Sequence, residues 1–291
     1  MIVEEAWNMN FAALRYEELA LNAFPVLHTE VYDGWILRFS EGKGYQGNCI
    51  SPLYLSTKSY EDKINYCENK FKEKGLPCVF KMTPNVPSAL DQQLAMRAYE
   101  QEDKTYIMEC SLMEEPESYP ASDRKKTETG TQESSISGKT EIRLSRKIDD
   151  NWLEAFVGMG CFRSMEGMNQ NICPDTARAM LTAIRNPVYC AALYENGSQK
   201  SPGKIVGCGL GVVEDNKIGI YDIRVDSGFR QNGIGARICR AIMEEGRKEG
   251  ACKAFLNVAA SNYPALRLYQ SLGFEEVYTC WYRVQNRGRG V

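Results

Sequence analysis

Apolar and polar residues follow two alternating patterns in the C-terminal half of the chain. Some stretches alternate residue by residue, which is typical of half-buried strands, and others repeat every three or four positions, which is typical of amphipathic helices. The patterns predict, in order, strand 141–145, helices 149–159 and 174–185, strands 188–194, 204–214 and 217–225, helix 233–249, strand 253–258, helix 262–272 and a strand pair ending near Val284. Strands dominate the middle and helices alternate with strands at the end, so we expect an α/β domain built on a mixed sheet.

The N-terminal half shows a similar order of elements. Its patterns predict helix 10–22, strands 26–32, 34–39 and 48–55, helix 60–74, strand 78–82, helix 87–97 and a strand pair across 99–112. The aromatic residues Tyr99 and Tyr106 follow their helix much as Phe274 and Tyr282 follow theirs. We interpret the chain as a divergent duplication.

A polar segment separates the two halves. Between Glu114 and Thr140 the apolar residues, prolines aside, are Tyr119, Ala121 and Ile136, too few to offset the entropy of ordering the segment. We therefore expect a domain at 1–113, a linker at 114–140 and a domain at 141–291.

Net charge and hydropathy exclude some classes of function. The net charge is −3, so there is no overall basic field for nucleic-acid binding, although residues 141–291 hold 20 basic and 16 acidic residues. No apolar run is long enough to span a bilayer, and the first residues are acidic where a signal peptide would be basic. We expect a soluble, cytoplasmic protein that binds neither nucleic acid nor membrane.

The cysteines and the single histidine narrow the chemistry further. The 11 cysteines are an odd number without a C-x-x-C pair, as expected of small buried side chains in a reducing cytosol. His28 alone cannot complete the usual zinc sites, and the C-terminal half has no histidine for a Ser-His-Asp or Cys-His site. We expect no metal, so the chemistry must use carboxylates, tyrosines, backbone amides or a cofactor.

A glycine-containing loop at 226–236 is the first candidate ligand site. A β-rich run ends at Val225, and Arg230-Gln-Asn-Gly-Ile-Gly235 then opens an amphipathic helix. Glycines admit a ligand to the backbone, and the free N–H groups and dipole of a helix N-terminus favour phosphate. The pattern R-x-x-G-x-G alone leaves phosphate binding and a purely structural turn equally open.

The second candidate segment is the helix expected at 262–272. Asn262 is a natural N-cap, Pro264 suits the first turn and Gly273 ends the helix. Asn262 and Tyr269 are seven positions apart, which places them on one face about 10.5 Å apart along the axis. An extended ligand could lie along that face.

Together these motifs resemble the GNAT superfamily of N-acetyltransferases over about residues 141–284. Strand, R-x-x-G-x-G, helix, strand and N-x-x-A-x-x-L-Y-x-x-x-G-F occur in the family's order and spacing. The whole chain resembles bacterial tandem-GNAT proteins with a degenerate N-terminal copy. The resemblance implies two tandem GNAT-like domains, each with a mostly antiparallel twisted sheet flanked by helices.

The resemblance also implies an acyl-CoA site in the C-terminal copy. The strand Ile223, Arg224 and Val225 would pair with the pantetheine arm. Asn262 would hydrogen-bond that arm beside Ala265, and Tyr269 would stand near the sulfur. The pyrophosphate would lie among Arg230, Gln231, Asn232, Gly233, Ile234, Gly235 and Ala236.

The expected reaction is transfer of an acetyl group from acetyl-CoA to a primary amine of a small molecule or peptide, by direct attack in a ternary complex. Tyr269 is the expected general acid and Asp222 the expected general base; Glu166, Glu214 and Tyr221 are alternative bases. Structural roles remain open too: Tyr269 as a core aromatic, Asn262 as a cap and Arg230 as a solvated charge. The alternative function is a non-catalytic acyl-CoA-binding or sensing module. Because helix 60–74 begins without glycines, we expect no second CoA site.

Overall fold

The structure is a computed structural model that describes residues 9–40, 44–113, 140–160, 173–195 and 203–285. Its helices are α1 (Phe11–Ala23), α2 (Tyr60–Glu73), α3 (Ser88–Met96), α4 (Asp150–Gly158), α5 (Pro174–Thr182), α6 (Ile234–Lys248) and α7 (Tyr263–Ser271). Its strands are β1 (His28–Tyr32), β2 (Trp35–Phe39), β3 (Ile50–Pro52), β4 (Val79–Met82), β5 (Tyr99–Ser111), β6 (Thr140–Ser145), β7 (Val188–Glu195), β8 (Ile205–Glu214), β9 (Lys217–Val225), β10 (Lys253–Ala259) and β11 (Glu275–Gln285). The predicted helices and most strands are confirmed to within a few residues.

All the strands join one eleven-stranded sheet in the order β1-β2-β3-β4-β11-β5-β10-β9-β8-β7-β6. The pairs β3–β4 and β9–β10 are parallel, and the other neighbours are antiparallel. The expected mixed, mostly antiparallel α/β fold is therefore confirmed. Counted from the junction of the two halves, each parallel pair lies at the same place: β4 and β10 border the exchanged strands, and β3 and β9 come next. A duplication requires this symmetry.

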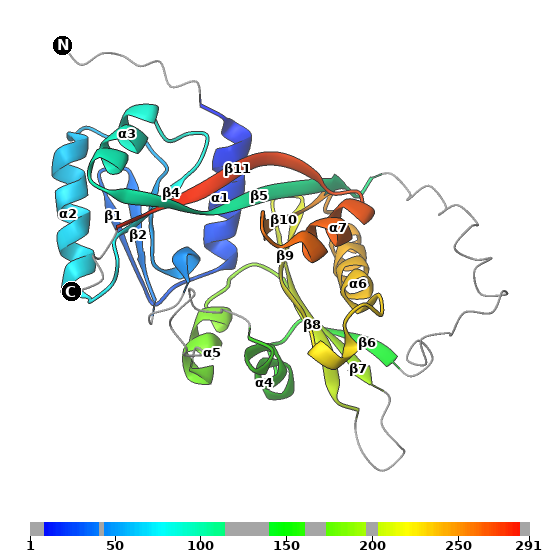
Figure 1. The fold of residues 1–291 in the computed structure, drawn as a ribbon. Helices are drawn as coiled ribbons and strands as arrows, with labels where there is room; N and C mark the ends of the chain where they lie inside the picture. Colours follow the sequence, from blue (N-terminus) through cyan, green and yellow to red (C-terminus); the bar gives the residue numbers. More distant parts are fainter. Residues whose placement is uncertain (1–8, 41–43, 114–139, 161–172, 196–202, 286–291) are drawn as a thin grey trace.

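The two halves exchange their last strands. β5 comes from the N-terminal half but lies between β10 and β11, and β11 lies between β4 and β5. Figure 1 shows β5 and β11 side by side across the junction. The sheet is thus continuous across the two expected domains, whose boundaries at 113 and 141 remain a proposal drawn from the polar segment 114–140.

The prediction of two terminal strand pairs, across 99–112 and ending near Val284, was wrong. Each segment forms one long strand. The polar run Glu100–Thr105 resembles a turn in sequence, but it lies within β5, where Asp103 has φ +47° and the register with β11 shifts opposite Cys280 and Tyr282. A bulge lets the long strand bend while it stays in the sheet.

The helices cover the sheet in separate groups (Figure 1). α6 and α7 pack on one face of the C-terminal half, whereas α1, α4 and α5 pack on the opposite face. α2 and α3 cover the N-terminal half. Helix α1 therefore comes from the N-terminal half but packs against the C-terminal core, for example through Tyr16 and Phe255, whose ring centroids are 5.0 Å apart.

The cysteines in the described part of the chain are free thiols, most of them buried in these cores. Burial raises the pKa of several thiols, including that of Cys239 to about 12. A neutral buried thiol packs as a small apolar side chain. The sites named below therefore involve no disulfide.

Candidate functional site

The candidate site begins where β9 and β10 diverge. The two parallel strands pair only from Lys217 to Ile220 of β9 and from Lys253 to Leu256 of β10. Beyond Leu256, β10 remains paired with β5, while β9 continues to Val225 paired with β8. Among the described strands, the last residues of β9 thus have a partner on one side only, which leaves an open edge for an extended ligand.

A bulge at Asp222 shapes this open edge. Asp222 has φ +49°, and the register between β8 and β9 shifts between the pairs Leu210↔Tyr221 and Cys208↔Arg224. The extra residue turns Ile223 toward β8 at Gly209, where an added Cβ would lie 2.4 Å from the Ile223 Cδ1 atom. Glycine at 209 therefore allows the bulge to pack.

Glycines alternate along β8, and their role was not predicted from the sequence. Added Cβ atoms at Gly207, Gly209 and Gly211 would each lie within 3.0 Å of isoleucine side chains, mainly those of α6. The period-two spacing of Gly207, Gly209 and Gly211 in the sequence was the available signal, because alternate residues share one face of a strand. These glycines let α6 lie close to the sheet beside the open edge.

The loop after β9 presents the N-terminus of α6. Gly233 is the N-cap with φ +70°, and no side chain caps the helix. Gln231 also has φ +63°, while the Asn232 amide donates to the carbonyls of Phe229 (3.2 Å) and Arg230 (2.9 Å). The loop is therefore fixed by its own hydrogen bonds, and the first N–H groups of α6 are left for an anion.

Two of the predicted phosphate-binding residues also have structural roles. The Arg230 Nε atom donates to the carbonyl of Val225 at 3.3 Å, which folds its side chain over the end of β9. Gly235 lies against α7, since an added Cβ would be 3.1 Å from the Leu268 Cδ2 atom, whereas the space around Gly233 is open. Of the two glycines, only Gly233 has open space where a ligand could approach.

Helix α7 follows β10 and borders the place where β9 and β10 diverge. The Asn262 side chain caps it by accepting from the Ala265 N–H at 3.3 Å, and the Asn262 side chain is exposed. Capping uses one acceptor of the amide, so its NH2 group remains able to donate to a ligand.

Tyr269 projects from α7 toward the bulge. It is 9% exposed, and its ring meets Phe274 edge-on with centroids 5.9 Å apart. Burial raises the pKa of the phenol, with smaller contributions from Cys239, Asp222 and, in the opposite direction, Arg224. Asp222 itself lies 3.5 Å from the Arg224 guanidinium. The fold thus brings Tyr269, Asp222 and Arg224 together, with the phenol protonated at neutral pH.

The alternative bases lie elsewhere. Glu214, at the far end of β8, accepts from Arg15 (3.1 Å) and Asn186 (2.6 Å) and serves as a structural anchor for α1. The buried Tyr221 ring folds back over Gly219, away from the bulge. Glu166 lies outside the described residues.

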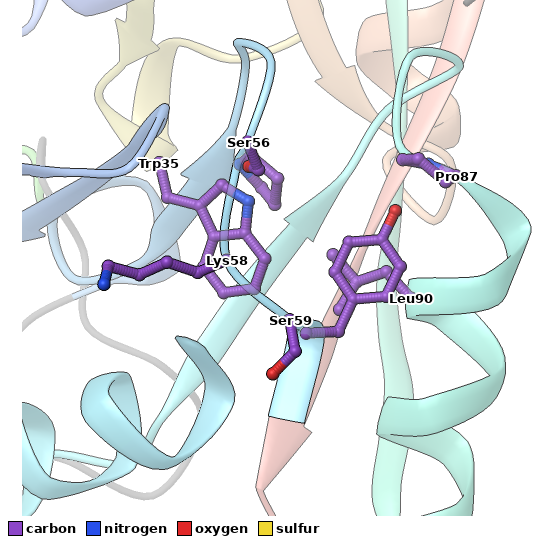
Figure 2. A pocket seen from close by; sticks show the side chains of 8 residues that line it. Trp35, Ser56, Lys58, Ser59, Pro87 and Leu90 are labelled. Carbon is purple, nitrogen blue, oxygen red and sulfur yellow. The ribbon is translucent and has the colours of Figure 1, made fainter. Parts of the chain in front are cut away.

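The N-terminal half has a cavity at the corresponding place, where β3 and β4 diverge. This cavity has a volume of about 230 Å³. Figure 2 shows the side chains that line it, which belong to Trp35, Pro52, Ser56, Lys58, Ser59, Tyr60, Pro87 and Leu90. It differs from the C-terminal site in two ways: β3 ends at Pro52, which lacks an N–H, and the Ser59 side chain caps α2 by accepting from the Asp62 N–H. Both differences disfavour a pantetheine strand and a pyrophosphate here, so the absence of a second CoA site stays a prediction.

No group of three or more histidine, cysteine or acidic side chains arranged to hold a metal occurs within the described ranges. Likewise, none of the helices found there is long and apolar enough to cross a membrane.

The candidate site thus combines an open strand edge, the glycine N-cap of α6 and a tyrosine on α7. Residues 159–274 match the family model of the acetyltransferase (GNAT) family. Residues 159–274 thus have the sequence pattern of a GNAT acetyltransferase domain.

Related sequences agree with this assignment. The chain is 23% identical over 275 residues to the uncharacterized N-acetyltransferase YobR of Bacillus subtilis, covering 93% of this chain and 98% of that protein. A shorter segment of 83 residues is 31% identical to the [ribosomal protein bS18]-alanine N-acetyltransferase of Escherichia coli, covering 28% of this chain and 56% of that enzyme.

Solved structures show that the whole fold is shared. A tandem GNAT protein from the clavulanic acid biosynthesis pathway matches with a TM-score of 0.61 and 11% identity, over 95% of this chain and 93% of that one. A GCN5-related N-acetyltransferase from Kribbella flavida matches with a TM-score of 0.60 and 10% identity, over 95% and 96%. The tandem architecture expected from the sequence is therefore confirmed.

Proposed function

We propose that the C-terminal half transfers an acetyl group from acetyl-CoA to a primary amine of a small molecule or peptide, by direct attack in a ternary complex. The observation that carries the proposal is the edge of β9 beyond Ile220, where β10 no longer pairs with it. This edge ends beside the N-terminus of α6, which no side chain caps. The strand edge can pair with the extended pantetheine arm of acetyl-CoA, and the helix N-terminus can bind its pyrophosphate.

Residues of this chain would hold the cosubstrate as follows. The backbone of Ile223, Arg224 and Val225 pairs with the pantetheine amides, and the exposed Asn262 amide donates to the same arm beside Ala265. The pyrophosphate lies against the turn formed by Arg230, Gln231, Asn232, Gly233, Ile234, Gly235 and Ala236. Its negative charge is stabilised by the first N–H groups of α6 and by the helix dipole.

Two side chains would move protons during the transfer. The amine nitrogen forms a bond to the thioester carbon, the carbon–sulfur bond breaks, and the departing thiolate takes the proton of the Tyr269 hydroxyl. Asp222, beside the same tyrosine, accepts the proton that the ammonium group loses before attack, and the second proton, which the nitrogen loses after attack, restores the Tyr269 hydroxyl. No covalent acyl-enzyme is required, since the described site holds no cysteine or serine paired with a base.

The acceptor class extends from small amines to peptide amines. The bS18-alanine N-acetyltransferase of Escherichia coli, which is 31% identical to an 83-residue segment of this chain, is named for a protein substrate. An acceptor panel should therefore include peptides with a free N-terminal alanine beside polyamines and other small amines. Thiol release measures turnover with each acceptor.

Calorimetric titration with acetyl-CoA tests the proposal. We expect one molecule to bind per chain, and we expect Gly233→Glu to abolish binding because it places a carboxylate where the pyrophosphate should lie. Gly250→Glu is the matched control: Gly250 also has positive φ and open space around its Cα, but it follows the opposite end of α6. No binding to the unmodified protein would refute the proposal, and binding without acceptor-dependent thiol release across the panel would favour a non-catalytic acyl-CoA-binding module.

A further inference from the structure

Three charged side chains are buried together beneath α1, away from the acyl-CoA site. Glu17 of α1 is 3% exposed, Arg38 of β2 is 4% exposed and Lys81 of β4 is 6% exposed. Arg38 and Lys81 interrupt the otherwise apolar strands WILRF and VFKM. Burying a charge costs several kcal/mol unless a partner compensates it, so the balance of charges here needs a physical explanation.

The single carboxylate is already engaged. The Lys81 Nζ atom lies 2.6 Å from the Glu17 Oε2 atom, and the Tyr278 hydroxyl donates to Oε1 at 2.8 Å. Among the described residues, Arg38 donates to two neutral carbonyls, those of Gln46 (3.1 Å) and Phe24, and forms no ion pair. Two buried cations therefore share one buried anion, a net charge of +1.

The other titratable groups that face the cluster remain neutral at neutral pH. Burial raises the pKa of the Cys49 thiol, that of the Cys280 thiol to about 12, and that of the Tyr282 phenol well above its ordinary value. Glu17 is the one carboxylate whose charge acts on Arg38 in the described part of the chain. The excess positive charge thus has no compensating group among the described residues.

A small cavity adjoins both cations. It has a volume of about 10 Å³, enough for one water-sized occupant, and it is lined by Glu17, Ala20, Leu21, Arg38, Gln46, Cys49, Ser51 and Lys81. Lys81 has three N–H donors and uses one of them on Glu17 among the residues described here. A water molecule would satisfy donors in this cavity but would leave the charge uncompensated.

We propose that this cavity is a binding site for one small monovalent anion, with chloride as its occupant, held between Arg38 and Lys81. Chloride is only slightly larger than water, whereas phosphate and carboxylate anions are too large for a cavity of this volume. The bound ion brings the buried charge to zero. It connects α1 to β2 and β4 next to the exchanged strand β11, so its binding stabilises the junction of the two halves.

The first test is the stability of the full chain in sodium chloride and in sodium gluconate at the same ionic strength, because gluconate is too large for the cavity. A ligand that binds only the folded state raises the unfolding temperature with its concentration. We expect a rise of about 2 °C or more for each tenfold increase in chloride. Equal stability in the two salts would overturn the proposal.

Two substitutions change the buried charge in opposite directions. Lys81→Met brings Glu17 and Arg38 to zero net charge and should abolish the chloride effect, whereas Glu17→Gln raises the charge to +2 and should enlarge it. Lys104→Met is the matched control, since it removes an exposed lysine from β5 and should leave the chloride effect unchanged. A chloride effect of the same size in Lys81→Met would contradict the proposal.

Diffraction gives a reading that does not depend on the variants. In crystals grown from sodium chloride, an anomalous difference map at long wavelength should show a chlorine peak between Arg38 and Lys81. A water at that place with no anomalous signal would refute the assignment.

Discussion

Tyr269 is the proton donor in the proposed reaction, and its surroundings keep it protonated until the thiolate departs. Burial raises the pKa of the phenol, and the charges of Asp222 and Arg224 act on it in opposite directions. Removing the hydroxyl alone therefore tests the proposed proton transfer.

We expect Tyr269→Phe to lower kcat by about 100-fold, the usual effect of losing a general acid. The ring and its contact with Phe274 are retained, so the Kd for acetyl-CoA should change less than about twofold. Assays of thiol release measure kcat, and calorimetry measures the Kd. An unchanged kcat would remove Tyr269 from the proposed reaction.

Gly209 permits a test of the packing that supports the open edge. In Gly209→Ala the new Cβ would lie 2.4 Å from Ile223 Cδ1 and 3.0 Å from Ile238 Cγ2. Overpacking of this kind should lower the free energy of unfolding by about 1–3 kcal/mol. Gly228→Ala, whose Cβ would have only Asp226 Oδ1 nearby at 3.7 Å, should change the free energy of unfolding by less than about 0.5 kcal/mol. Urea unfolding compares the two variants, and equal effects would show that Gly209 has no special packing role.

Among the elements, the segment between β3 and α2 shows how the N-terminal half differs from its counterpart. The fully buried Lys63 side chain donates to the Asp33 carbonyl and to the Ser56 hydroxyl, and its Nζ atom lies 3.3 Å from the Asp33 carboxylate and 4.0 Å from the centre of the Trp35 ring. This lysine ties the loop to the β1–β2 turn. The N-terminal loop is therefore fixed by a buried lysine, whereas the Asn232 amide, within the C-terminal loop itself, fixes that loop.

The burial of Lys63 predicts a pH dependence of stability. Burial, its largest cause, lowers the pKa of Lys63 from 10.5 to about 8 in the folded protein, although Asp33 opposes the shift. Between about pH 8 and 10.5 the unfolded chain binds more protons than the folded one, so the lysine's contribution to stability rises with pH across that range. Relative to Lys63→Met, the wild type should gain up to about 3 kcal/mol between pH 7 and 10, as measured by urea unfolding. A constant difference would show that Lys63 titrates normally.

The helices and most strands were predictable because their signals are local. Asn262 and Ser59 are N-caps, Gly273 follows a helix end with φ +84°, and the apolar periods give the buried faces. The glycine loop and Tyr269 were also predictable from their spacing. The single long strands β5 and β11 were not, because they pair with each other across more than 160 residues of sequence and nothing near Asp103 distinguishes a bulge from a turn.

The exchanged strands make the sheet of each half depend on the other half. β5 pairs with β10 and β11, and β11 pairs with β4 and β5, so either half alone would lose the strand that completes its sheet and expose a long unpaired edge. The covalent connection between the halves is not what holds them together. We therefore expect the C-terminal half to need the N-terminal half in order to fold.

Cleavage of the chain within 114–139 should leave the protein assembled. A protease site inserted there, cut after folding, should give two fragments that elute together in size-exclusion chromatography and unfold in one transition. The fragments 1–113 and 140–291 expressed separately should be insoluble or unfolded. Separation of the cut fragments under native conditions would contradict the dependence described above.

The antiparallel pairing of β5 with β11 bears on how the two halves of the chain arose by duplication. Two equivalent strands that pair antiparallel along almost their whole lengths, each completing the other half's sheet, are the geometry of a two-fold homodimer with swapped ends. A homodimer must keep two identical sites, because one gene encodes both. Once the subunits are joined in a single chain, each site changes independently, and the proline-ended strand and side-chain cap of the N-terminal half are the kind of change that this freedom permits.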